Sequence, residues 1–124
     1  MMAPSNRDTD AERRRIGERL RQAREYLGLS QDEVARHLAV TRTAITGIET
    51  GQRRVEALEL KKLSELYKQP SSYFSGEDEF ASALPVDVAH LARKAAKLSS
   101  KDREELGRFA EYLRARSATD GENG

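Results

Sequence analysis

Arginine and threonine side chains gather in a short stretch of this sequence, at a spacing that suits contact with a nucleic acid. Arg42, Thr43 and Thr46 stand at positions i, i+1 and i+4, which share one face of a helix. An arginine can donate two hydrogen bonds to guanine, and a threonine methyl group can contact thymine. These residues are therefore candidates for contacts with the base edges of DNA, provided that a helix presents them together.

A capping box opens a short helix before these residues. Ser30 is a favourable N-cap residue, and Glu33 stands three positions later, where its side chain can reach the amide of Ser30. Val34, Ala35 and Leu38 then place an apolar stripe on about two turns of helix. Because helices this short are marginal in water, the stripe must pack against neighbouring helices.

A second helix follows after a tight turn. Thr41 offers another N-cap, and Ala44, Ile45 and Ile48 supply an apolar face. Gly51 is expected to end this helix with a positive φ angle. Two short helices around a tight turn, the second with a polar face, indicate a unit that reads DNA by placing its second helix in the major groove.

Two segments resemble the helix-turn-helix family of Cro and the phage repressors, often called the XRE family: G-L-S-Q-x-x-V-A over residues 28–35 and V-T-x-x-x-I-T-x-I-E-x-G over residues 40–51. The flanks IGERLRQAREYLGLS and LELKKLSELYKQPSSYF resemble the first, fourth and fifth helices of that family, so the resemblance covers residues 16–74. A chance capping box on two ordinary core helices is the alternative. The agreement of spacing, caps, glycine stop and both flanks favours the family.

The resemblance implies that the first helix of the unit crosses the phosphate backbone while the second lies in the major groove. Gly47 would then face the DNA, where most relatives carry a side chain. A glycine inside a helix lowers helix stability by about 1 kcal/mol relative to alanine. Gly47 therefore either permits a closer approach to the duplex or is a substitution that the protein tolerates without benefit. Phosphate contacts are expected from Gln31, Thr41, Thr50, Arg53 and Arg54.

Arg24 and Glu49 match two further positions of the family pattern. In phage repressors of this type these positions form a partly buried ion pair that joins the first and third helices. If the pair forms in this chain, removal of one partner is expected to cost about 3–5 kcal/mol, because the other charge is left buried without a partner.

The composition argues against several other classes of site and function. The 124 residues include 35% charged and 37% hydrophobic residues, two histidines and no cysteine, so disulfides, thiolate zinc sites and histidine clusters are not expected. The sequence shows no pairing of a nucleophile with a base and no glycine-rich phosphate loop, so we expect no enzyme, no metal and no cofactor. The lack of a long apolar run and of a signal peptide indicates a cytoplasmic protein. The family resemblance implies a bacterial or phage type that is associated with the nucleoid.

The formal net charge of +1 is small for a DNA-binding protein, so the distribution of charge matters more than its sum. Many arginines crowd the first predicted helix. We expect most of them to be solvated and paired with neighbouring carboxylates, and we place the DNA contacts on the helix-turn-helix unit instead.

The predicted fold is all-α, with a five-helix, repressor-like helix-turn-helix domain followed by a C-terminal two-helix hairpin. The domain covers residues 10–74, and residues 75–84 form an acidic linker rich in small residues. The hairpin covers residues 85–116, while residues 1–9 and 117–124 are expected to be flexible tails.

Apolar residues repeat with helical spacing in both arms of the predicted hairpin. Two helices of this length cannot bury such stripes by themselves, so they must pack on the first domain or on a second copy of the chain. We favour self-association, because the family resemblance implies a two-fold dimer. The candidate dimerisation residues are Leu91, Leu98, Leu106, Phe109 and Leu113.

Three functions remain open. The first is a sequence-specific transcriptional regulator, in most cases a repressor, that binds an inverted repeat in double-stranded DNA as a homodimer. The second is an antitoxin or adaptor whose C-terminal helices grip a protein partner. The third is a nucleoid-associated protein that organises DNA with weak specificity.

Overall fold

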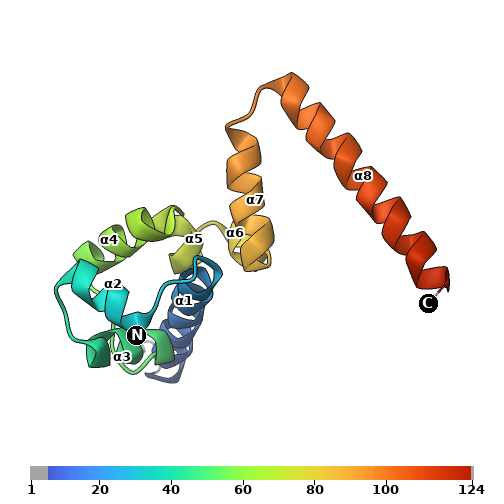
Figure 1. Ribbon diagram of the computed structural model, residues 1–124. Helices are drawn as coiled ribbons and strands as arrows, with labels where there is room; N and C mark the ends of the chain where they lie inside the picture. Colours follow the sequence, from blue (N-terminus) through green and yellow to red (C-terminus); the bar gives the residue numbers. More distant parts are fainter. Residues whose placement is uncertain (1–5, 124) are drawn as a thin grey trace, which may run out of the picture. The chain divides into compact units, whose positions relative to one another are not determined.

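The structure, a computed structural model, describes residues 6–123 of the chain and the side chains of residues 9–119. Every element in this range is a helix, which confirms the predicted all-α class. The chain divides into two units, one up to Ala89 and one from His90 onward. The helices, labelled in Figure 1, are α1 (Asn6–Tyr26), α2 (Gln31–Leu38), α3 (Arg42–Thr50), α4 (Ala57–Tyr67), α5 (Ser71–Ser75), α6 (Glu79–Ala83), α7 (Val86–Ala96) and α8 (Ser100–Asn123).

Helices α1 to α5 enclose the hydrophobic core of the first unit. Leu20 from α1, Ile45 from α3 and Leu63 from α4 are almost completely buried. The aromatic rings of α4 and α5 close the core, since Tyr67 and Tyr73 pack edge-on against Phe74 with ring centroids 6.1 and 5.1 Å away. Burial on this scale supplies most of the stability of the short helices, which could not persist alone. The remaining core residues are Ala23, Val34, Ala35, Leu38, Ile48 and Ala89.

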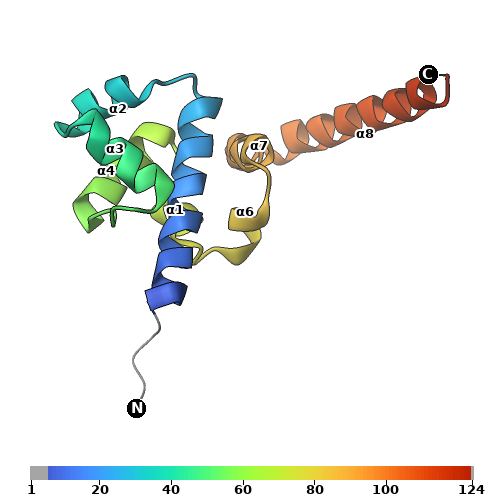
Figure 2. The same ribbon diagram turned by 90° about the horizontal axis from the view of Figure 1, so that it is seen from below.

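A glycine lets α1 and α3 cross in direct backbone contact. A Cβ atom at Gly17 would lie less than 3.0 Å from the carbonyl oxygens of Ile48 and Glu49 in the last turn of α3. One turn earlier in α1, the backbone of Arg14 packs equally closely on Gly51, whose φ is +81°. Figure 2 shows α3 beside α1, and α2 packs on α3. This crossing fixes the orientation of α3 relative to the rest of the domain.

The caps of α2 and α3 follow the sequence prediction. The Ser30 hydroxyl accepts a hydrogen bond from the Glu33 amide, and the Glu33 carboxylate accepts one from the Ser30 amide, each at 3.1 Å. The Thr41 hydroxyl accepts from the amide of Ala44, also at 3.1 Å. The turn between the helices passes through Ala39, whose φ of +58° is unusual for a residue other than glycine.

The segment 75–84, predicted as a linker, contains helix α6. The Asp78 carboxylate caps this helix by accepting from the Ala81 amide at 3.1 Å, and the Ser82 hydroxyl donates to the Tyr73 carbonyl at 2.6 Å. Ala81 and Leu84 pack against the core. Small and acidic residues are common in linkers, but in this segment they cap a helical turn and fit closely against α5.

The terminal helices are also longer than the sequence patterns indicate. Helix α1 begins at Asn6, inside the predicted tail 1–9, of which residues 1–5 lie outside the described range. Helix α8 continues to Asn123, beyond the predicted end at residue 116. No proline interrupts α8, and the Thr119 hydroxyl bonds back to the Ala115 carbonyl at 3.1 Å, as helical threonines do.

The C-terminal helices leave large apolar side chains in contact with solvent. Leu91 on α7 and Phe109 on α8 are 52% and 57% exposed, and Leu98 in the turn between the two helices is 39% exposed. Phe109 stacks on Tyr112, one turn further along α8, with a centroid distance of 6.2 Å. No helix within the described range is both long and apolar enough to span a bilayer.

Candidate nucleic-acid interface

The sequence-predicted base contacts lie on the exposed face of α3. Arg42, Thr43 and Thr46 are all exposed, whereas Ile45 and Ile48 on the opposite face are buried. The first turn of α3 therefore carries polar side chains outward while its apolar side anchors the helix in the core. Such a helix, held from behind by α1 and flanked by α2, can enter a groove of DNA without loss of its packing.

Side chains from the start of α2 contact the start of α3. The Arg42 Nε atom lies 3.4 Å from the Gln31 Oε1 atom, and an Arg42 Nη1 atom lies 3.8 Å from the Asp32 carboxylate. The Thr46 hydroxyl is within 3.1 Å of the same Gln31 oxygen and 3.2 Å from the Arg42 carbonyl. Arg42 and Asp32 are mostly exposed, so their ion pair contributes little stability, and Arg42 remains available to a base.

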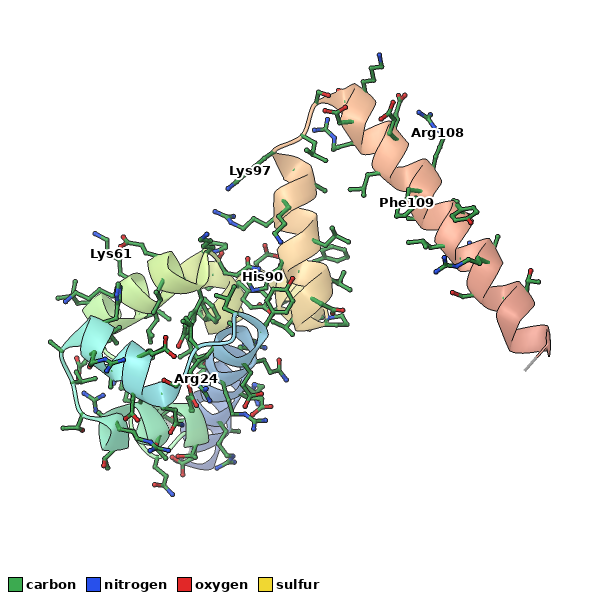
Figure 3. All side chains as sticks on the ribbon, in the orientation of Figure 1. Arg24, Lys61, His90, Lys97, Arg108 and Phe109 are labelled. Atoms are coloured by element: carbon green, nitrogen blue, oxygen red, sulfur yellow. The ribbon has the colours of Figure 1, made fainter. Side chains whose placement is uncertain are left out.

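Arg24 and Glu49 form a bidentate ion pair between α1 and α3. Arg24 donates from Nε to one carboxylate oxygen at 2.7 Å and from Nη2 to the other at 3.0 Å. The Glu49 side chain is only 3% exposed and that of Arg24 is 11% exposed. Arg24, labelled in Figure 3, also donates to the Leu29 carbonyl at 2.9 Å. The hydrogen bond to Glu49 is the main reason that the pKa of Arg24 is raised above its ordinary value.

Gly47 lies under the turn that joins α3 to α4. The Arg53 amide donates to the Gly47 carbonyl at 2.9 Å, and a Cβ atom at Gly47 would come within 3.1 Å of the Arg53 Cβ atom. Gly47 therefore lets this turn pack closely on α3, since an added Cβ atom would require Arg53 to shift by a few tenths of an ångström, a reason that neither of the two sequence interpretations considered. The turn packs on the backbone of Gly47 alone, and Thr46 beside it stays exposed.

The predicted phosphate-binding residues differ in exposure and in whether their side chains already have partners within the protein. The side chain of Arg54 is exposed and has no ion pair among the described residues. Arg53 pairs with the Glu59 carboxylate at 3.0 Å, and the Thr50 hydroxyl donates to the Thr46 carbonyl at 2.9 Å. The remaining two, Gln31 and Thr41, lie at the starts of α2 and α3, where helix N-termini attract anions.

Sequence reasoning missed how Gln31 connects these groups. Its amide nitrogen donates to Glu49 at 3.0 Å while its amide oxygen faces Arg42 and Thr46. The only feature of the sequence that pointed to Gln31 was its position as the first residue of a capped helix. Among the described residues no three histidine, aspartate or glutamate side chains are arranged to hold a metal ion.

Comparison with known proteins agrees with this geometry. A family model described as a helix-turn-helix domain matches residues 15–71, which include all of α2 and α3. Over 91 residues the chain is 30% identical to the HTH-type transcriptional regulator ImmR of Bacillus subtilis (strain 168), and the aligned region covers 73% of this chain and 72% of that relative. The chain therefore belongs to the XRE family of helix-turn-helix proteins and is a DNA-binding transcriptional regulator.

Proposed function

We propose that this regulator is a sequence-specific repressor that binds an inverted repeat as a homodimer. The observation that carries the proposal is the two-sided character of α3, with Arg42, Thr43 and Thr46 exposed and Ile45 and Ile48 buried. The exposed arginine and threonine side chains stand beside the N-terminus of α2, where backbone amides attract phosphates. This arrangement suits insertion into the major groove.

In the proposed complex Arg42 pairs with a guanine, and Thr43 and Thr46 contact neighbouring bases. Gly47, covered by Arg53, contributes only its backbone at the edge of the contact. Contacts to the sugar-phosphate backbone fix the register of the protein without reading sequence. The residues proposed for these contacts are Gln31, Thr41, Thr50, Arg53 and Arg54.

Self-association is proposed through the C-terminal helices. Exposed apolar side chains of this size lose contact with water when two copies pack together, and each Å² of apolar surface removed from water contributes roughly 25 cal/mol. A symmetric dimer would present two copies of α3 to two successive turns of the major groove. The proposed contact residues are Leu91, Leu98, Leu106, Phe109 and Leu113, of which Figure 3 labels Phe109.

Selection of binding sites from a pool of random duplexes at about 150 mM salt tests this function. We expect enrichment of an inverted repeat whose half-site centres lie about 10 base pairs apart, one turn of the double helix. The Arg42→Ala variant should lose the preference at one position of each half-site, while Lys61→Ala on α4 should enrich the same sequence as the natural chain.

Two other results would contradict the proposal. Salt-sensitive binding to every duplex without an enriched sequence would indicate a DNA-organising protein. An enriched sequence without two-fold symmetry would show that the dimer assignment fails. A reporter promoter that carries the enriched site then decides the direction of regulation, since a repressor lowers its expression.

A further inference from the structure

Gln31 joins the buried ion pair to the exposed face of α3. Its Nε2 atom donates to Glu49 Oε1 at 3.0 Å, while its Oε1 atom lies 3.1 Å from the Thr46 hydroxyl and 3.4 Å from Arg42 Nε. Gln31 is the first residue of α2 and is half-buried. One end of its amide therefore points into the protein, and the other points to two candidate base contacts.

The carboxylate of Glu49 determines which end of the amide points inward. A carboxylate paired with a guanidinium offers only acceptors, and both oxygens of Glu49 already accept from Arg24, at 2.7 and 3.0 Å. If the Gln31 amide were rotated by half a turn, its oxygen would face a buried negative charge. The amide group must therefore keep its NH₂ toward Glu49 and its oxygen toward Arg42 and Thr46.

We propose that Glu49 is a positioning residue for base recognition. By fixing the Gln31 amide it holds the side chains of Arg42 and Thr46 in a defined orientation before DNA binds, in addition to joining α1 to α3. This role rests on the proposed function, because it assigns base contacts to Arg42 and Thr46. Side chains ordered in advance lose less conformational entropy on binding, and a bidentate contact with guanine depends strongly on orientation.

Two variants break the link at different points. Glu49→Gln keeps the size of the side chain and one acceptor for Arg24, but its NH₂ group faces Gln31 and favours the rotated amide. Gln31→Met removes the amide and leaves the Arg24–Glu49 pair intact, so it serves even if the first variant is poorly folded. Glu65→Gln is the matched control, because Glu65 is exposed on α4 and its side chain has no ion pair in the described part of the chain.

The measurement is the dissociation constant of each full-length variant for the selected duplex and for its single-base variants, at one salt concentration. Both link variants should lower discrimination roughly tenfold at the base position that Arg42→Met also affects, and Glu65→Gln should leave it unchanged. In the Glu49→Gln/Arg42→Met double variant the first substitution should add no further loss there. Gln31→Met also loses the proposed phosphate contact of Gln31, so it is judged by discrimination alone. Uniform weakening by Glu49→Gln on all duplexes, or unchanged discrimination in both link variants, overturns the proposal.

A readout without DNA separates this proposal from the function on which it rests. In NMR spectra of the free protein, the side-chain NH₂ of Gln31 should exchange with water more slowly than that of the exposed Gln52, and Glu49→Gln should remove the difference. Equal exchange in the natural chain overturns the positioning role even when DNA binding is specific. Slow exchange in a protein that fails to discriminate between sequences overturns the proposed function, and the role in recognition with it.

Discussion

Gly17 sets the distance between α1 and α3. The carbonyl oxygens of Ile48 and Glu49 occupy the space that a side chain at position 17 would need. These carbonyls belong to the last turn of the helix that presents Arg42, so any shift there changes the direction of the reading helix. Close packing of this kind cannot relax around an added methyl group without movement of the backbone.

Gly17→Ala is therefore expected to destabilise the protein by at least about 1–3 kcal/mol, the usual cost of overpacking. Thermal unfolding followed by circular dichroism would measure it. Gly107→Ala is the matched control, since a Cβ atom at Gly107 on α8 meets nothing within 4 Å. That substitution should leave the melting temperature unchanged or raise it, because alanine favours a helix by about 1 kcal/mol over glycine. A similar fall for both variants would contradict the packing argument.

Loss of the Glu49 carboxylate should be costly for a different reason. Glu49→Ala leaves Arg24, only 11% exposed, with no carboxylate nearer than that of the exposed Glu25 at 3.8 Å, and the expected loss is up to about 3–5 kcal/mol. Glu77→Ala removes an exposed carboxylate and should change stability by less than about 0.5 kcal/mol. Urea denaturation of both variants supplies the comparison. Equal shifts would show that the ion pair does not stabilise the fold.

Contacts between distant residues were the least predictable part of the site. The caps at Ser30 and Thr41 use neighbouring residues, so the sequence alone predicts them. The pairing of Arg24 with Glu49 was implied only by resemblance to a family, because no local pattern reports how two helices cross. The role of Gly17 depends on the same crossing, and the contact of Gln31 with Glu49 depends on the packing of α2 on α3; sequence reasoning found neither.

The capping box at the start of α2 makes its stability depend on pH. Hydrogen bonds from Ser30 hold the pKa of Glu33 below its ordinary value of 4.5. A carboxyl group whose pKa is lower in the folded state stabilises the fold above the unfolded pKa, and this contribution is lost as the pH falls through the folded value.

The difference in melting temperature between the natural chain and Glu33→Gln should therefore shrink as the pH is lowered from 6 through the acidic range. Glutamine can occupy the same capping position without titrating. Glu65→Gln, at an exposed position of α4, provides the control and should show no such trend. A difference that stays constant with pH would show that the charge of Glu33 adds nothing to the cap.

The C-terminal helices carry the prediction about assembly. Phe109→Asp places a charge within the proposed dimer contact and should convert the protein to a monomer, because a buried unpaired charge is unfavourable. Arg108→Asp changes the charge of the neighbouring residue, which is exposed, and should leave the dimer intact. Size-exclusion chromatography with light scattering measures the molar mass of both full-length variants and so distinguishes monomer from dimer. A dimer that survives Phe109→Asp would place the interface elsewhere.

The limits of the helices show where sequence patterns were insufficient. Caps and apolar stripes located α2 and α3, since each pattern is local, and the family resemblance placed α4. The acidic segment that forms α6 has the composition of a linker, and only its fit against Tyr73 and the core distinguishes it from one. At the end of α8 the polar composition suggested a tail, yet the same residues are compatible with a continued helix.

The whole chain is nearly neutral, so its binding to DNA must depend on where the charges lie. A formal net charge of +1 provides little long-range attraction. The ion pairs of α1 use several arginines within the helix itself, among them Arg13 with Asp10 and Arg21 with Glu18. The exposed Arg54 beyond α3 keeps its charge available to a phosphate.

The salt dependence of the affinity for DNA should therefore be set by a few local phosphate contacts. Arg54→Ala is expected to reduce the slope of log K against log salt concentration by about 1, which corresponds to one phosphate contact. Lys101→Ala on α8 removes the same charge from the molecule and should leave the slope unchanged. Titration of the selected duplex between 50 and 200 mM salt would measure both. Equal slopes for the two variants would mean that only total charge matters.

The short length of α3 affects how many genomic sites the protein recognises. Because α3 is only nine residues long and one of its faces is buried in the core, one chain can read only a few base pairs, and so short a sequence recurs by chance many times in any genome. Competition from these chance sites would distribute the protein widely along the chromosome. Two chains that must bind two short sequences at a fixed spacing recognise a combined site whose chance frequency is the product of the two single frequencies. The proposed dimer would therefore be far more selective than a single reading helix.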